Sequence, residues 1–282
     1  MKKNDPWQKT IARSGSLSGV GLHTGERSCL NVSPAATDRG LVFYKNGVKL
    51  GSLSKNEVRV AETTRCTALG KAPHDLLTAE HFLATASCLG ITNIKVDVEG
   101  PEFPALDGSA LGFVRFLKKL GLKKQNKKKQ VWRIREPIFC YESGKAIQAF
   151  PAEGNTLSVA YILDYDHPAL KNQGVDFDVN PRIFEKEIAP ARTFCTQEEA
   201  ESLKKLKLGR GADHTNTLVM SERGPVRNRL RFEDECARHK MLDLLGDLGL
   251  LGFGLCARIV GIRSGHTLNR RLVEEIRRQK RR

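Results

Sequence analysis

The feature that most constrains this chain is an apolar segment, residues 238–248, that carries three ionisable side chains at helical spacing. His239, Asp243 and Asp247 lie four residues apart, among leucines and Met241. This spacing places them on one face of a helix, and the apolar neighbours predict that the helix is buried on most sides. Buried imidazole and carboxylate groups are unfavourable without partners, and a metal ion is the simplest partner. A surface ion pair or a capped polar contact is the alternative interpretation.

A second segment, Thr78–His81, places a histidine next to a carboxylate. Catalytic zinc usually takes three protein ligands and leaves one position open. Adjacent helical residues point about 100° apart, so His81 could bind the ion while Glu80 takes a proton. The alternative for Glu80 is an exposed carboxylate at a helix N-terminus. A third segment, Ser264–Asn269, presents His266 in a Gly-His turn, where a structural loop histidine is the alternative.

Length and composition indicate a globular protein of two ordinary domains. The chain has 282 residues, 40% of them hydrophobic, and no stretch approaches the ~20 apolar residues of a membrane span. The basic residues among positions 1–9 are not followed by an apolar core, so we expect no secretory signal. Seven scattered cysteines without a Cys-x-x-Cys pair favour free thiols in a reducing cytoplasm.

The net charge of +15 could attract a nucleic acid, an anionic membrane surface or an anionic substrate. The basic residues cluster at positions 123–129, at 204–205 and in the tail, 277–282. For the tail, the alternative interpretation is a solvated basic surface that binds no partner. No zinc-finger spacing or RNA-binding aromatic segment is present, and only 6% of residues are aromatic, so no specific nucleic-acid motif is expected.

The polar, lysine-rich segment 125–130 predicts a linker between two halves, residues 1–124 and 131–282. Both halves repeat a coarse order of elements. We expect strands at 41–44 and 94–98 in the first half and at 157–163 and 256–260 in the second. Helices are expected at 79–89, 110–120 and 233–248. This order predicts an α+β fold of two similar domains, although no residue-level repeat is visible.

Seven segments in a fixed order resemble a known family, the UDP-3-O-acyl-N-acetylglucosamine deacetylases, which are zinc enzymes of lipid A synthesis. The resemblance covers nearly the whole chain and rests on Gly19–Gly25, Thr78–His81, Gly100–Ala110, Ala191–Phe194, Leu230–Glu235, His239–Asp247 and Ser264–Asn269. It implies two domains, each a β-sheet with helices on one face, and helix layers packed between the two sheets. The active site is then expected at the domain interface, a common place for clefts.

The resemblance implies one zinc ion per chain, held by His81, His239 and Asp243, with Glu80 as the general base. Imidazole and carboxylate ligands also tolerate Fe²⁺, so the metal in the cell is left open.

Amide hydrolysis also requires an acid, because an amine anion is a poor leaving group. His266 matches the family's acid, and Asp247 matches the carboxylate that orients it and favours its protonated form. Thr193 matches a hydroxyl that helps to stabilise the oxyanion. An ordinary strand threonine is the alternative for Thr193.

The expected substrate is an acylated UDP-sugar. The resemblance assigns its contacts to Lys240 near the sugar and phosphate, Lys145 at the nucleotide end, Tyr165 at the uracil, Phe194 facing the sugar, and His23 as an active-site neighbour. The acyl chain is expected to run near residues 196–220.

The chain departs from the family at Gly211–Thr217, and its lysine-rich linker and basic tail are not family signatures. We therefore expect a monomeric zinc amidohydrolase that releases acetate from UDP-3-O-(3-hydroxyacyl)-N-acetylglucosamine. The basic tail could also make peripheral contact with an anionic membrane. A zinc deacetylase of another N-acetyl sugar is one alternative. A basic non-catalytic relative that binds nucleic acid or anionic lipid is the other.

Overall fold

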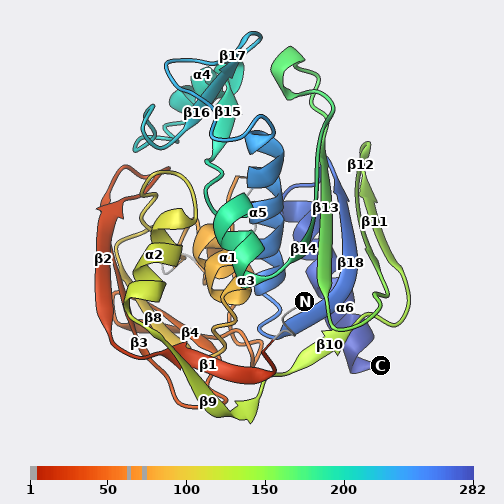
Figure 1. The fold of residues 1–282 in the computed structure, drawn as a ribbon. Coiled ribbons are helices and arrows are strands. Elements are labelled where there is room, and N and C mark those ends of the chain that lie inside the picture. Colours follow the sequence, from red (N-terminus) through yellow and green to blue (C-terminus); the bar gives the residue numbers. More distant parts are fainter. Residues whose placement is uncertain (1–4, 62–64, 72–74) are drawn as a thin grey trace.

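Two β-sheets lie on either side of a double layer of helices (Figure 1). The computed structural model describes residues 5–61, 65–71 and 75–282. The first sheet contains β2 (Gly15–Val20), β3 (Arg27–Pro34), β4 (Leu41–Lys45), β5 (Val48–Ser52) and β8 (Ile94–Glu99). Their order across the sheet is β2-β3-β8-β4-β5.

The second sheet comes from the C-terminal half of the chain. It contains β10 (Val131–Arg133), β11 (Ile138–Glu142), β12 (Lys145–Phe150), β13 (Leu157–Leu163), β14 (Gln173–Val179) and β18 (Gly254–Ile262). Five strands run in the order β11-β12-β18-β13-β14, and β10 pairs with β18 in parallel.

Four helices form the layers between the sheets. The first half supplies α1 (Glu80–Cys88) and α2 (Leu111–Lys119), and the second supplies α5 (Glu235–Gly249) and α6 (His266–Arg281). α1 and α5 lie side by side at the centre of the molecule (Figure 1). The α+β class and the expected placement of the helices between the sheets are confirmed.

Alternating polarity explains which face of the first sheet is buried. On β3, Leu30 and Val32 pair with Val98 and Val96 of β8, and all four side chains are buried. The intervening residues are polar and point the other way, as expected for a period of two. Phe82 of α1 then packs on this buried face, with its ring centroid 6.4 Å from that of Phe43 on β4. α1 is thereby fixed to the first sheet.

The strands and helices expected from the sequence are present at the expected places. The four expected strands correspond to β4, β8, β13 and β18, and the three expected helices to α1, α2 and α5, with ends that differ by up to two residues. The agreement follows from long periodic segments, in which burial and spacing point to the same element.

Most of the lysine-rich segment 125–130, predicted to be a linker, is part of a paired strand. Residues Leu122–Lys128 form β9, which pairs antiparallel with β1 (Trp7–Ile11). Only residues 129 and 130 separate β9 from β10. The lysine side chains are exposed to solvent, while the backbone of β9 forms hydrogen bonds with β1. Charged residues are common on exposed strands of this kind. The domain boundary at 124–131 stays a proposal.

A small lobe lies beyond the end of α5, at the top of Figure 1. It consists of β15 (Phe194–Thr196), α4 (Gln197–Lys205), β16 (Leu218–Ser221) and β17 (Gly224–Pro225). Thr196 starts α4 through a capping box with Glu199, in which each side chain bonds the other's backbone N–H.

The basic tail is the last turn and a half of α6, and part of it packs on the protein. The Arg277 guanidinium donates to the carbonyl oxygen of Leu250, and the Lys280 ammonium lies 3.9 Å from the Phe253 ring centroid. The short elements are β6 (Val60–Ala61), β7 (Ala68–Leu69), η1 (Pro168–Leu170), α3 (Pro181–Ile183) and η2 (Phe184–Ile188). In the described ranges, no helix has the length and apolar character to cross a membrane. The positions considered for a secretory signal fall partly on residues 1–4, outside those ranges.

Candidate active site

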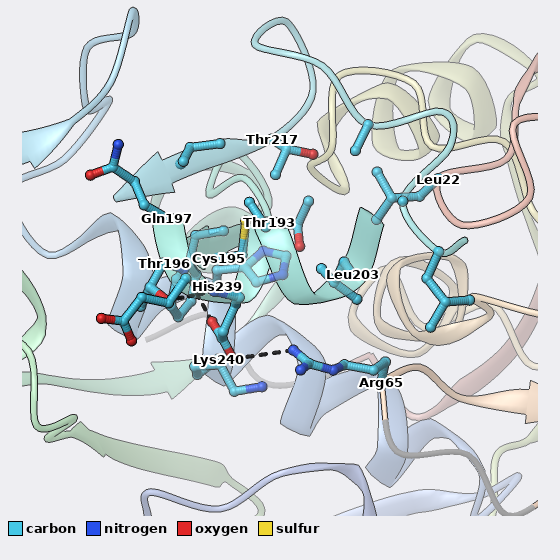
Figure 2. A pocket seen from close by; sticks show the side chains of 18 of the residues that line it. Leu22, Arg65, Thr193, Cys195, Thr196, Gln197, Leu203, Thr217, His239 and Lys240 are labelled. Atoms are coloured by element: carbon cyan, nitrogen blue, oxygen red, sulfur yellow. Dashed lines mark hydrogen bonds and ion pairs between the residues drawn. The ribbon is translucent and has the colours of Figure 1, made fainter. Parts of the chain in front are cut away.

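A pocket of about 890 Å³ opens between the two halves and beneath the small lobe (Figure 2). The structure brings eleven of the twelve predicted site residues to its wall: His23, Glu80, His81, Lys145, Tyr165, Thr193, Phe194, His239, Lys240, Asp243 and His266. The twelfth, Asp247, is fully buried and reaches the pocket through His266.

Three of these side chains form a group that could hold a metal ion. One ligand atom each from His81, His239 and Asp243 lies within 4.8 Å of the others. The Nε2 atoms of His81 and His239 are 3.7 and 3.4 Å from Oδ1 of Asp243. All three residues are buried, so the alternative of a surface pair for His239 and Asp243 is wrong.

A close approach between α1 and α5 brings this group together. Gly246 of α5 faces the backbone of Glu80, and a Cβ atom at this position would lie 2.3 Å from the Glu80 carbonyl oxygen. Only glycine therefore permits the two helices to approach so closely. One helix supplies His81 and the other supplies His239 and Asp243, so the crossing point determines the geometry of the group.

His239 is held with one ring nitrogen facing the metal group. Its Nδ1 lies 3.1 Å from the carbonyl oxygen of Ala191, and a carbonyl can only accept, so Nδ1 carries the proton. Burial lowers the pKa of His239 to about 4, with the neighbouring His81 acting in the same direction. The ring is therefore neutral and presents the Nε2 lone pair. The Phe194 ring meets it edge to face, with centroids 6.2 Å apart.

Asp243 divides its two oxygens between the histidines and a lysine. Lys240 donates to Oδ2 at 2.8 Å, which leaves Oδ1 facing His81 and His239. Burial acts to raise the pKa of Asp243, but the charge of Lys240, with a hydrogen bond from His81, outweighs it and holds the pKa well below its usual range. The carboxylate is therefore ionised. Lys240, predicted to contact the sugar and phosphate, is already engaged with a candidate ligand.

Glu80 is buried at the start of α1, so the alternative of an exposed N-terminal carboxylate is wrong. Its Oε2 accepts a hydrogen bond of 2.9 Å from the backbone N–H of Thr67. Burial raises the pKa of Glu80, against the opposing charges of His266 and His81. Glu80, Asp243 and His266 form a second group with ligand atoms within 4.8 Å of one another.

His266 is the first residue of α6, not part of an isolated turn. Its Nδ1 lies 2.9 Å from Oδ2 of Asp247, which also accepts a hydrogen bond from the Asn269 amide at 2.8 Å. The Thr67 hydroxyl donates to the other oxygen of Asp247. Burial acts to lower the pKa of His266, but the Asp247 carboxylate outweighs it and raises the pKa to about 9.

The remaining predicted residues occupy different parts of the wall. Thr193 donates its backbone N–H to Gly108 and lies next to Phe194, whose ring centroid is 6.1 Å from that of Tyr165. Lys145 is exposed at the start of β12. His23 is half-buried, and burial lowers the pKa of its ring.

Part of the apolar lining of the pocket comes from the small lobe, within residues 196–220, where the acyl chain is expected to run. Leu203, Leu208 and Val219 line it. Across the opening, Arg65 forms an ion pair of 3.1 Å with Glu199 (Figure 2). The divergent segment also contributes, since Ala212, Asp213, His214 and Thr217 line the pocket.

Sequence reasoning missed three residues that contact Glu80 or Asp247: Thr67, Gly246 and Asn269. Gly246 carries a usable signal, because a glycine inside an apolar helix indicates close approach of another backbone. Thr67 has no distinguishing sequence pattern, since it acts through one hydroxyl and one backbone N–H.

The donor set fits zinc. Two neutral imidazoles and one carboxylate are a common protein ligand set for catalytic zinc, and the orientation of His239 by a backbone carbonyl is the usual support for such a ligand. The same set also suits other transition metals.

Comparisons with known proteins show the family to which the chain belongs. The sequence model of the family described as UDP-3-O-acyl N-acetylglycosamine deacetylase matches residues 8–278. The UDP-3-O-acyl-N-acetylglucosamine deacetylase of Thermodesulfovibrio yellowstonii is 37% identical over 273 residues, which cover 95% of this chain and 92% of that protein. The protein of the same name from Oleidesulfovibrio alaskensis is 40% identical over 266 residues, or 93% of this chain and 86% of that protein. The chain therefore belongs to the UDP-3-O-acyl-N-acetylglucosamine deacetylase family.

Proposed function

We propose that this chain removes acetate from UDP-3-O-(3-hydroxyacyl)-N-acetylglucosamine with zinc as its metal, Glu80 as general base and His266 as general acid. As a member of its family, the chain is a hydrolytic deacetylase of lipid A biosynthesis. The observation that carries the assignment of roles is that Glu80 and His266 each place a ligand atom within 4.8 Å of the other and of Asp243, which also belongs to the metal group.

His81, His239 and Asp243 would hold the zinc ion. When bound, zinc supplies a Lewis acid that polarises the amide carbonyl and lowers the pKa of water. The three residues contribute a fixed geometry. Asp243 is ionised by its partner Lys240, and His239 is neutral and oriented by Ala191, so no proton must be lost from either of these two side chains when the metal binds.

Glu80 acts as the base that removes a proton from the attacking water. The Thr67 N–H holds Oε2, so Oε1 is available to the pocket. Because burial raises the pKa of Glu80, the carboxylate binds the proton more strongly than a free glutamate would. His266 then donates a proton to the departing amine, and Asp247 keeps the imidazole protonated until that step.

The Thr193 hydroxyl donates a hydrogen bond that stabilises the developing oxyanion. Other residues that line the pocket contact the rest of the substrate. We assign Tyr165 and Lys145 to the nucleotide, Phe194 to the sugar, and His23 to the neighbourhood of the reacting groups; all four residues line the pocket. The acyl chain runs along Leu203, Leu208 and Val219 of the small lobe, where its apolar surface leaves water.

The decisive experiment measures release of free amine from the substrate by purified protein loaded with one equivalent of zinc, beside Glu80→Ala. The parent should turn over, and the variant should lose on the order of 10²- to 10⁴-fold in kcat while its zinc content is unchanged. A folded, zinc-loaded parent without turnover would contradict the substrate assignment. A variant with parental kcat would contradict the role of Glu80.

A second candidate is a related N-acetyl sugar as the substrate. The divergent segment favours it, since Ala212, Asp213 and His214 line the pocket. The same assay with N-acetyl sugars that lack the acyl chain tests this candidate. Higher kcat/KM for one of them would replace the first assignment.

We also propose a monomer in the cytoplasm. Contact between the tail and an anionic membrane stays a proposal, with less charge available than the sequence indicates, because Arg277 and Lys280 pack on the protein and Arg278 pairs with Glu275. Co-sedimentation with phosphatidylglycerol vesicles, repeated after Arg281 and Arg282 are changed to Ser, tests this contact.

A further inference from the structure

Glu102 is a fully buried carboxylate that lies outside the metal group. Its Oε1 accepts hydrogen bonds from the Thr78 hydroxyl at 2.6 Å and from the His23 N–H at 3.0 Å. Its Oε2 accepts from the Thr24 N–H and the Thr24 hydroxyl, both at 2.9 Å. A buried carboxylate is unfavourable unless such donors surround it, so the three donor residues and Glu102 form one unit.

One arm of this unit holds the start of α1. Thr78 has a φ of +57°, a left-handed conformation that is unusual for a β-branched residue. It directly precedes Ala79, the N-cap of α1, so its conformation sets the direction from which Glu80 and His81 begin. The hydrogen bond to Glu102 is what stabilises the Thr78 side chain in this orientation. The neighbouring backbone is also paired with the Glu102 segment, since Leu77 donates to Pro101 and Phe103 donates to Leu77.

The other arm holds the turn at His23 and Thr24, which reaches the small lobe. The carbonyl oxygen of His23 accepts from the N–H of Arg210, and that of Leu22 accepts from Gly211. These bonds fix the beginning of the segment whose later residues line the acyl side of the pocket. A single carboxylate therefore contacts both the residue that leads into the base-bearing helix and the turn that holds the substrate-side wall.

We infer that Glu102 is a positioning residue that keeps the start of α1 in register with the substrate-side wall. This inference rests on the proposed roles of Glu80 and His81. Loss of the Thr78 arm should displace the base and the first metal ligand. Loss of the Thr24 arm should displace the wall that receives the acylated sugar. The two arms should therefore affect different kinetic parameters.

The first test removes the Thr78 hydroxyl without changing its shape, as Thr78→Val. We expect kcat and zinc affinity to fall roughly 10- to 100-fold, the range typical of outer partners of metal ligands. Thr78→Ser keeps the hydroxyl and should restore both towards the parental values. Zinc affinity is measured by competition with a chromogenic chelator, so this readout does not depend on turnover.

Ser28, which also bonds Glu102, provides a matched control. The buried Ser28 hydroxyl donates to the backbone carbonyl of Glu102 and does not touch its carboxylate. Ser28→Ala loses one buried hydrogen bond, as Thr78→Val does, and should lower the melting temperature by a similar amount. It should leave kcat and zinc affinity within about twofold of the parent, so it separates positioning from general stability.

The second test uses Thr24→Val, which keeps the helix arm. We expect KM to rise several-fold while zinc affinity is unchanged. The inference is overturned if Thr78→Val behaves like Ser28→Ala in both kcat and zinc affinity. If Thr78→Val does not fold, a Thr24→Val variant with parental KM overturns it. An inactive parent would instead contradict the proposed function, and the zinc affinities would still test the role of Glu102.

Discussion

At the scale of single residues, the proposed base and acid are tuned by different surroundings. Burial of the Glu80 carboxyl raises its pKa, and the backbone N–H of Thr67 donates a hydrogen bond to one of its oxygens. His266 is held by the ionised Asp247, which raises its pKa to about 9 despite burial. The base binds protons more strongly than usual, and the acid stays charged over the whole neutral range. Both shifts suit a reaction in which a proton passes from water to an amine.

The pH dependence of kcat/KM tests this arrangement through Asp247→Asn. In the parent, the imidazolium of His266 is lost as pH rises through about 9, so activity should fall on that alkaline side. Asparagine removes the negative charge, while burial still acts to lower the pKa of His266. The alkaline limb should therefore move to lower pH in the variant. Asp178→Asn, on the solvent side of β14, serves as a control, and an unmoved limb in Asp247→Asn would contradict the role of Asp247.

The same pair links stability to pH in the metal-free protein. The folded pKa of His266, about 9, lies above the value of 6.5 for the free side chain. Its contribution to the free energy of unfolding is therefore complete below pH 6.5 and is lost as pH rises through about 9. Melting curves of the parent and Asp247→Asn should converge above that range.

At the scale of elements, the site depends on where α1 crosses α5. Gly246 and Gly249 lie on the side of α5 that faces α1, and a Cβ atom on Gly246 would meet the Glu80 backbone whereas one on Gly249 would lie 3.2 Å from the Leu83 carbonyl oxygen. The histidines from the two helices meet edge to face, with ring centroids 5.1 Å apart. A small shift of either helix would therefore separate the metal ligands.

The substitution Gly246→Ala tests this crossing. Overpacking typically destabilises a protein by about 1–3 kcal/mol, partly offset by alanine's higher helix propensity, about 1 kcal/mol. We expect a net loss of stability by denaturant unfolding and weaker zinc binding, because the helices must separate. Gly249→Ala should have the smaller effect on both. Equal zinc affinity in Gly246→Ala and the parent would show that the close approach is not needed for the site.

At the scale of the whole molecule, the metal group joins the two halves of the chain. His81 belongs to the helix fixed on the first sheet, and His239 and Asp243 belong to the helix that lies on the second. A bound metal therefore adds stability to the interface between the halves as well as a reactive centre.

Removal of the metal should lower stability in a concentration-dependent way. A ligand at 100 times its Kd stabilises a protein by about 2.7 kcal/mol if it binds only the folded state. A chelator should therefore lower the melting temperature and abolish turnover, and added zinc should restore both. His239→Ala should show little response to the chelator. A parent melting temperature that is insensitive to chelation would contradict the bridging site.

The pairing of β1 with β9 gives a further prediction at this scale. Lysines of the expected linker lie in a strand whose register runs from Trp7 with Lys128 to Ile11 with Leu122. A protease needs a locally unfolded segment, so brief trypsin treatment should not cut first between residues 122 and 129. We expect earlier cleavage at Lys204–Lys207, at the end of α4. First release of two fragments divided near residue 125 would contradict the pairing.

Much of the fold could be predicted because its central elements are long and periodic. β13 begins and ends at the expected residues, and α5 was recognisable from its apolar surroundings. The strand within the expected linker could not be predicted, because β9 is stabilised by a partner more than 100 residues away and the lysine side chains give no indication of that pairing. The site residues were recognised by their resemblance to a family. Thr67 was missed because its role depends on hydrogen bonds that spacing does not reveal.

The division of the metal ligands between α1 and α5 also has a consequence for synthesis on the ribosome. Domains generally fold as they emerge, starting from the N-terminus. The segment with Glu80 and His81 leaves the exit tunnel long before His239 is translated, so these polar side chains face water until the second helix arrives. The nascent chain can therefore hold no complete binding site, and the ion can be captured only after translation of the second half.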